Sequence, residues 1–208
     1  MTDVNSKVNG AAAEAPVKKI RRGVSNETQA TSKLRFHEKD AAPNRLFMAH
    51  LHSVSVAWSE GGEGKQFEGE KIPRLVFEFA SNTKDATQRR YVDKTLFPVE
   101  SSVETIPGGD KDWQVNSILT WIKHILDIYY LNGRPLTEEE EDALSLPFVD
   151  FDDEGNYVPV DVKEVLAGYA QLFNNVAAIM NGTFNLADGE TPKPCFRDAN
   201  GNFIRCWI

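Results

Sequence analysis

Residues 44–58 read NRLFMAHLHSVSVAW, and this stretch decides how the chain is expected to fold. Apolar residues alternate with polar ones along it, which is the period of a half-buried strand. Before Ser53 the apolar signal is carried at odd positions, by Phe47, Ala49 and Leu51, and after it at even positions, by Val54, Val56 and Trp58. A change of parity inside one strand indicates a β-bulge or a sharp bend. The stretch therefore predicts a bent first strand over 46–58, of the kind with which a small barrel closes its sheet.

Two further strands are expected downstream. The stretch IPRLVFEFAS, residues 72–81, predicts strand two over 74–80, because its large apolar residues share one parity. The stretch RRYVDKTLFPVE, residues 89–100, predicts strand three over 89–97, which Pro98 ends. A Pro-Gly-Gly sequence at 107–109 then closes this all-strand half of the chain.

The middle of the chain is expected to be helical. Apolar residues recur at helical spacing over 113–130 and again over 161–181, so each segment predicts an amphipathic helix with one wide stripe that must be covered. Between them, Thr137 and Glu140 have the spacing of a capping box, which predicts a short acidic helix that Pro147 stops. The side chains expected to point inward include Ile118, Ile122, Leu166, Leu172 and Phe173.

The last segment reads KPCFRDANGNFIRCWI, residues 193–208, and predicts a β-hairpin. Its centre is Asn200-Gly201, the dipeptide that best suits a two-residue type I′ turn. With that turn, Phe196 is expected to face Arg205, and Cys195 to face Cys206. Two cysteines make no disulfide framework, so both are expected to remain thiols.

The order of these segments is strands, then helices, then a terminal hairpin. That order predicts an α+β protein built on an OB-like five-stranded barrel, β-β-β-α-α-α-β-β, with a large helical insert over 110–182 between strands three and four. Residues 44–208 are expected to form this single domain. Residues 1–43 are polar and show neither helical nor strand periodicity, so they predict a disordered or extended basic arm.

The charge is distributed unevenly. The net charge is −8, yet residues 1–39 hold eight Lys or Arg against four Asp or Glu, and the rest of the chain holds 15 against 27. A globally basic nucleic-acid binder is thereby excluded, and any polyanion must be met by the arm or by a local basic patch. No stretch is apolar enough to predict a leader or a membrane span.

The sequence carries no sign of catalysis. There is no phosphate-binding loop, no nucleophile elbow and no recognisable pair of catalytic carboxylates. The four histidines show no metal-ligand spacing with the two cysteines. We therefore expect a protein that is not an enzyme and that needs neither cofactor nor metal.

Aromatic and basic residues interleave on the predicted strands. Single strands of nucleic acid bind where bases stack on aromatic rings and cations follow the backbone. Aromatic residues also fill barrel interiors, and parity alone does not tell which face is inside. The candidate nucleic-acid-binding residues are Arg74, Arg89, Arg90, Tyr91, Lys94, Phe196, Arg205 and Trp207 on the strands, and Lys18, Lys19, Arg21 and Arg22 in the arm.

The stretches 44–58, 72–81, 89–100 and 193–208 quoted above, in this order, resemble the single-stranded DNA-binding proteins of tailed bacteriophages. The resemblance implies an OB-fold, single-stranded DNA as the ligand, and a non-catalytic role in replication or recombination in the host cytoplasm, with phage replication proteins as possible partners. The chain departs from that pattern in its insert, which is much longer than one OB helix. The alternative is a phage virion or assembly protein, whose basic arm binds neighbouring subunits of a homo-oligomer.

Overall fold

The computed structural model describes residues 22–29, 48–81, 91–99, 109, 112–147, 150–154, 156–158 and 160–207. Their main feature is an open antiparallel sheet with the strand order β3-β2-β1-β6. Its strands are β1 (Met48–Glu60), β2 (Lys71–Ser81), β3 (Tyr91–Leu96) and the short β6 (Arg205–Trp207). Two further short strands, β4 (Asp150–Phe151) and β5 (Tyr157–Val158), pair with each other as a separate ribbon.

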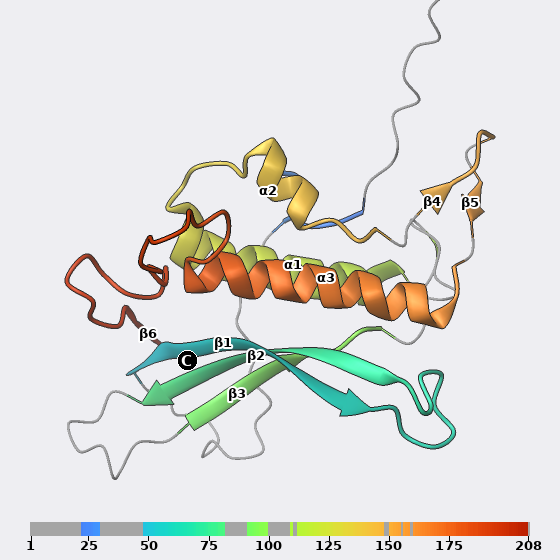
Figure 1. Cartoon of the computed structure of the whole chain (residues 1–208), viewed down its shortest axis with the longest axis horizontal. Helices are drawn as coiled ribbons and strands as arrows, with labels where there is room; N and C mark the ends of the chain where they lie inside the picture. Colours follow the sequence, from blue (N-terminus) through green and yellow to red (C-terminus); the bar gives the residue numbers. More distant parts are fainter. Residues whose placement is uncertain are drawn as a thin grey trace, which may run out of the picture.

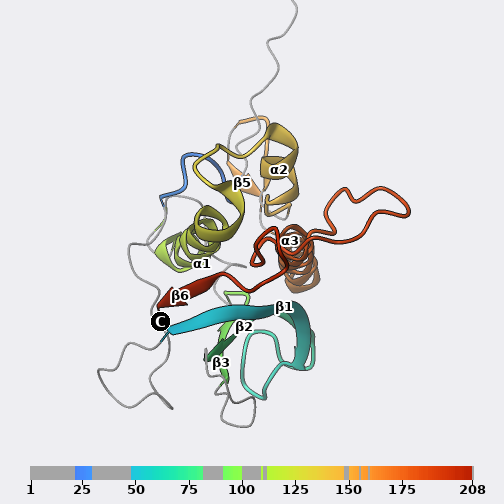
Figure 2. The same cartoon turned by 90° about the vertical axis from the view of Figure 1, so that its left-hand side faces the viewer.

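The helices form a layer over this sheet. They are α1 (Asp112–Leu126), continued by one π-helical turn η3 (Asp127–Leu131), the short α2 (Glu138–Ala143) and the long α3 (Val162–Asn181). Helices α1 and α3 lie side by side over the sheet, and α2 lies beyond them on the side away from the strands (Figures 1 and 2). The core fills the space between sheet and helices, where the ring centres of Phe77 on β2 and Trp121 on α1 are 4.8 Å apart.

The predicted OB-like barrel is wrong. Among the described residues the sheet stays open, because β3 pairs only with β2, and β6 pairs with β1 over just three residues, Met48 to His50. The physical reason lies in the two helices. Their apolar stripes cover the inward face of the strands, so Leu75, Phe77 and Phe79 are fully buried without a second wall of strands.

The predicted bulge in the first strand is confirmed. The register of β1 against β2 passes from Leu51 opposite Phe79 to Ser53 opposite Glu78, so one residue of β1 is extra. Leu51 and Val54 are both buried although their parity differs. The bulge therefore keeps the apolar side chains of both halves of β1 in the core.

The predicted register of the terminal hairpin is wrong by one residue. Arg197 pairs across the turn with Phe203, and the backbone N–H of Ile204 donates to the carbonyl of Phe196 over 3.0 Å, so Phe196 does not stand opposite Arg205 as predicted. A type I′ turn needs a positive φ at both central residues, but in this turn only Gly201, with a φ of 80°, has one. The carboxylate of Asp198 instead accepts backbone hydrogen bonds and closes a wider turn.

This register also changes the partner of the last strand. The backbone of Cys206 pairs with Ala49 on β1, so it does not stand opposite Cys195 as the two-residue turn predicted. Cys195 is a free thiol, and burial raises its pKa to about 12. The thiol of Cys195 is therefore protonated and unreactive near neutral pH.

Part of the predicted arm packs against the helices. In the segment 22–29, Val24 is 1% exposed and its backbone N–H donates to the carbonyl of Leu144 over 3.1 Å. The side-chain amide of Asn26 donates to the carbonyl of Leu136 over 3.0 Å and accepts from its N–H over 2.7 Å. These residues thus belong to the folded body, whereas the rest of the predicted arm lies outside the described residues.

Replacing Asn26 with alanine is expected to lower the free energy of unfolding by about 1 to 3 kcal/mol, because both polar backbone groups of the buried Leu136 lose their partner. Urea denaturation followed by circular dichroism measures this change. The neighbouring exposed Glu27 serves as the control, and Glu27→Ala is expected to leave stability nearly unchanged. Equal stability of the two variants would contradict the docking of this segment.

Candidate nucleic-acid interface

Several of the predicted binding residues cannot be placed. Five of them lie outside the described residues, namely Lys18, Lys19, Arg21, Arg89 and Arg90. Tyr91 and Trp207 lie at the first residue of β3 and the last residue of β6, with only their backbones described.

Arg22 lies in the packed segment and is turned inward. Its side chain is 8% exposed and forms an ion pair with Asp112, the first residue of α1. Its guanidinium also donates to the backbone carbonyl of Asp112 over 3.2 Å. The charge of Arg22 is thus directed at the beginning of a helix and not at the solvent.

Lys94, Phe196 and Arg74 each contact other parts of the protein, and only Phe196 is fully buried. The ammonium of Lys94 lies 5.8 Å from the ring centre of the buried Trp121, and burial lowers the pKa of Lys94. The ring of Phe196 is 3% exposed, which leaves no face for a base. Half-buried Arg74 donates to the carbonyl of Trp58 over 3.2 Å.

The remaining predicted residue, Arg205, lies beside a group of rings and cations at the β1–β6 edge of the sheet. The ring of Phe203 stacks on that of His50 with 4.2 Å between their centres, and lies 5.3 Å from that of His52. The guanidinium carbon of Arg197 lies 3.8 Å from the ring centre of Phe203. Arg205 is exposed and pairs with His50 across the two strands. We call these five residues the Arg197 cluster.

Arg197 is exposed and yet held in place. Its Nη1 donates to the carbonyl of Gly201 over 2.7 Å while the guanidinium covers the ring of Phe203. The one carboxylate in this turn, that of Asp198, accepts the backbone N–H groups of Asn202 and Asn200, and these bonds lower its pKa. A planar cation held in this way can stack on a base and contact a phosphate.

Arg197 was not among the predicted binding residues, because the expected register placed Phe196 and Arg205 on the same face. A signal was present in the sequence. Asp198 is followed by Asn200 and Asn202, and an aspartate that binds the backbone two residues on favours a wider Asx turn over a type I′ turn.

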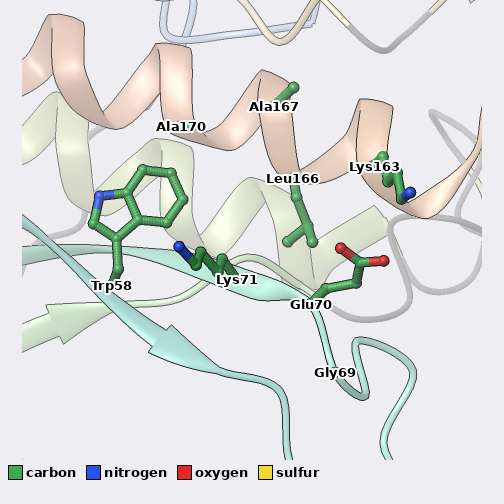
Figure 3. A pocket seen from close by; sticks show the side chains of 8 residues that line it. All are labelled: Trp58, Gly69, Glu70, Lys71, Lys163, Leu166, Ala167 and Ala170. Carbon is green, nitrogen blue, oxygen red and sulfur yellow. The ribbon is translucent and has the colours of Figure 1, made fainter.

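A second surface feature lies at the other end of β1. Here the indole of Trp58 is 51% exposed and lines a cleft of about 340 Å³ between the sheet and α3 (Figure 3). This cleft was not predicted from the sequence, because three separate segments form it. The cleft is lined by Trp58, Gly69, Glu70, Lys71, Lys163, Leu166, Ala167 and Ala170.

Other kinds of site are not found in the described parts of the chain. Histidine, cysteine and carboxylate side chains there form no group of three that could hold a metal ion. No helix among the described residues combines the length and apolar character needed to cross a membrane. Comparison with protein-family models, curated proteins and solved structures found no match.

Proposed function

We propose that the protein binds single-stranded DNA without catalysis, and that the Arg197 cluster is its main contact. The observation that carries the proposal is the exposed guanidinium of Arg197, whose central carbon lies over the ring of Phe203 at 3.8 Å from the ring centre. Guanidinium planes stack on unpaired bases, and their N–H groups pair with phosphate oxygens. Phage replication or recombination, the setting that the sequence resemblance suggests, belongs to this proposal.

The charge distribution supports a local contact of this kind. The whole chain carries −8, so a strand would be repelled by most of the surface. Arg205 adds a second exposed cation on β6, two residues after Phe203, and the carboxylate of Asp198 is already engaged by backbone N–H groups. Binding is therefore expected to be concentrated at this edge and to weaken steeply with salt.

Substitution of Arg197 tests the proposal. Binding of a labelled single strand of about 16 nucleotides is measured by fluorescence anisotropy over a salt series. Arg197→Ala is expected to weaken binding and to flatten the salt dependence by about 0.7 log units per log unit of salt, because one phosphate contact is lost. Arg197→Lys is expected to keep the salt dependence but still weaken binding, because an ammonium cannot stack as a planar group.

The control is Lys65→Ala, which removes one exposed cation from the loop between β1 and β2 and should leave binding nearly unchanged. Failure of the wild-type protein to bind at about 50 mM salt would overturn the proposal, since phosphate contacts are strongest at low salt. Equal binding by Arg197→Ala and wild type would reject the Arg197 cluster as the contact.

A further inference from the structure

The Trp58 cleft has one aromatic and one aliphatic side. Trp58 belongs to the last part of β1, where it faces Pro73 on β2 across the ladder. Leu166, Ala167 and Ala170 line the cleft from α3, which lies above the indole (Figure 3). A planar apolar group of the right thickness could be held between these two sides.

The charged residues of the cleft lie around this apolar centre. Lys71 and Lys163 are both exposed, and within the described part of the chain neither ammonium has an ion-pair or hydrogen-bond partner. The side chain of Lys71 runs beside the indole, whereas Glu70 and Lys163 lie at the other end of the cleft (Figure 3). The cleft thus offers two free cations and one hydrogen-bond acceptor.

The aromatic side of the cleft, its lysine ammonium groups and the carboxylate of Glu70 match the parts of a nucleotide. A base has apolar planar faces that stack on an indole, and its phosphate is an anion that lysine binds as a point charge. A carboxylate accepts hydrogen bonds from the amino group of a base such as cytosine. The volume of about 340 Å³ falls within the range of small-ligand sites, roughly 300 to 1,000 Å³.

We propose that the Trp58 cleft binds one nucleotide unit. The base lies against the indole of Trp58, its amino edge faces Glu70, and its phosphate, which is attached at the opposite edge of the base, is held by Lys71. A peptide rich in carboxylates fits less well, because Glu70 would repel it and nothing planar would cover the indole.

The cleft is separate from the Arg197 cluster. Trp58 and His50 stand eight positions apart on β1, which corresponds to about 26 Å along a strand. The inference rests on the proposed function only for the source of the nucleotide. A single strand of DNA bound along the length of β1 would place one of its nucleotides at the cleft. A free nucleotide has the same chemistry and is distinguished below.

Titration of the full chain with dCMP and with dTMP, followed by tryptophan fluorescence, tests the cleft. Quenching by dCMP is expected in the wild type and is expected to disappear in Trp58→Leu, because a stacked base quenches the indole. Trp113→Leu is the matched control, since Trp113 is 67% exposed on α1 and lies outside the cleft. Ala170→Leu fills the cleft without changing charge and should also abolish the response. Glu70→Ala should remove a several-fold preference for dCMP over dTMP.

The same variants are then tested with a cytosine oligonucleotide of about 16 residues. Tighter binding of the oligonucleotide than of dCMP, with a loss in Trp58→Leu, identifies a DNA strand as the source; equal affinity identifies a free nucleotide. In one outcome, the oligonucleotide binds through Arg197, dCMP does not quench the fluorescence of Trp58, and Trp58→Leu binds the oligonucleotide as wild type does. That outcome overturns the cleft inference and leaves the proposed function standing. If dCMP quenches Trp58 but no oligonucleotide binding depends on Arg197, the proposed contact at Arg197 falls and the cleft inference stands.

Discussion

Replacing Phe173 with alanine is expected to lower the free energy of unfolding by about 3 to 5 kcal/mol. Phe173 is fully buried near the middle of α3, and its ring centre lies 5.7 Å from that of the buried Tyr169. The change removes the transfer free energy of the ring and leaves a cavity between helix and sheet. Such a loss is a large share of the roughly 5 to 15 kcal/mol that stabilises a typical domain.

Urea denaturation of the two proteins, followed by circular dichroism, measures this effect. Gln171→Ala is the matched control, because Gln171 is exposed on the same helix and alanine is a good helix former. Gln171→Ala should change the unfolding free energy by less than about 0.5 kcal/mol. An equally small change in Phe173→Ala would show that α3 does not pack on the sheet through this stripe.

Glu140→Gln is expected to lower the free energy of unfolding by about 1 to 3 kcal/mol at neutral pH. The carboxylate of Glu140 is 8% exposed and pairs with Arg134, whose Nη2 donates over 2.7 Å. It also accepts from the hydroxyl of Tyr130 and, over 2.8 Å, from the backbone N–H of Thr137 in the capping box of α2. The range is kept low because the side chain of Arg134 is 41% exposed, and solvent screens the pair.

The same group predicts how stability depends on pH. The hydrogen bonds from Arg134 are the main cause that lowers the pKa of Glu140 from 4.5 to about 2. Since the pKa is lower in the folded than in the unfolded state, the stabilisation is fully present above about pH 4.5 and is lost as the pH falls towards 2. In this window the unfolding free energy of wild type should fall more steeply than that of Glu140→Gln.

Glu138→Gln is the control for this pH dependence, because Glu138 is exposed in the same first turn of α2. Its unfolding free energy should follow that of wild type across the acid range. If the unfolding free energies of wild type and Glu140→Gln fell in parallel as the pH is lowered, the hydrogen bonds of Glu140 would not stabilise the fold.

The helices are the part of the fold that could be read from the sequence. The predicted third helix over 161–181 is confirmed, with Asp161 accepting from the backbone N–H of Glu164 over 2.9 Å and Gly182 ending the helix at a φ of 68°. The capping box of Thr137 and Glu140 is also confirmed. Caps and apolar periodicity act between residues a few positions apart, so the local sequence contains the whole interaction.

The candidate sites could be read only in part. Arg205, and the interleaving of rings and cations on the strands, could be recognised in the sequence, whereas Arg197, Lys71 and Lys163 could not. A turn register that was wrong by one residue hid the contact of Arg197 with Phe203. The Trp58 cleft joins the end of one strand, the start of the next and a helix about 100 residues further along, and no local pattern relates them.

The sequence by itself determined where α3 begins and ends, where α2 begins, that β1 contains a bulge, and that the long strands each have one apolar face. The tertiary structure alone decided that helices cover that face and that the sheet stays open among the described residues, in place of the predicted barrel. The physical reason is that the alternation of apolar and polar residues along a strand determines only that one face of the strand must be buried. A second wall of strands and a layer of helices bury that face equally well, and the choice depends on how the apolar stripes of α1 and α3 fit against β1 and β2.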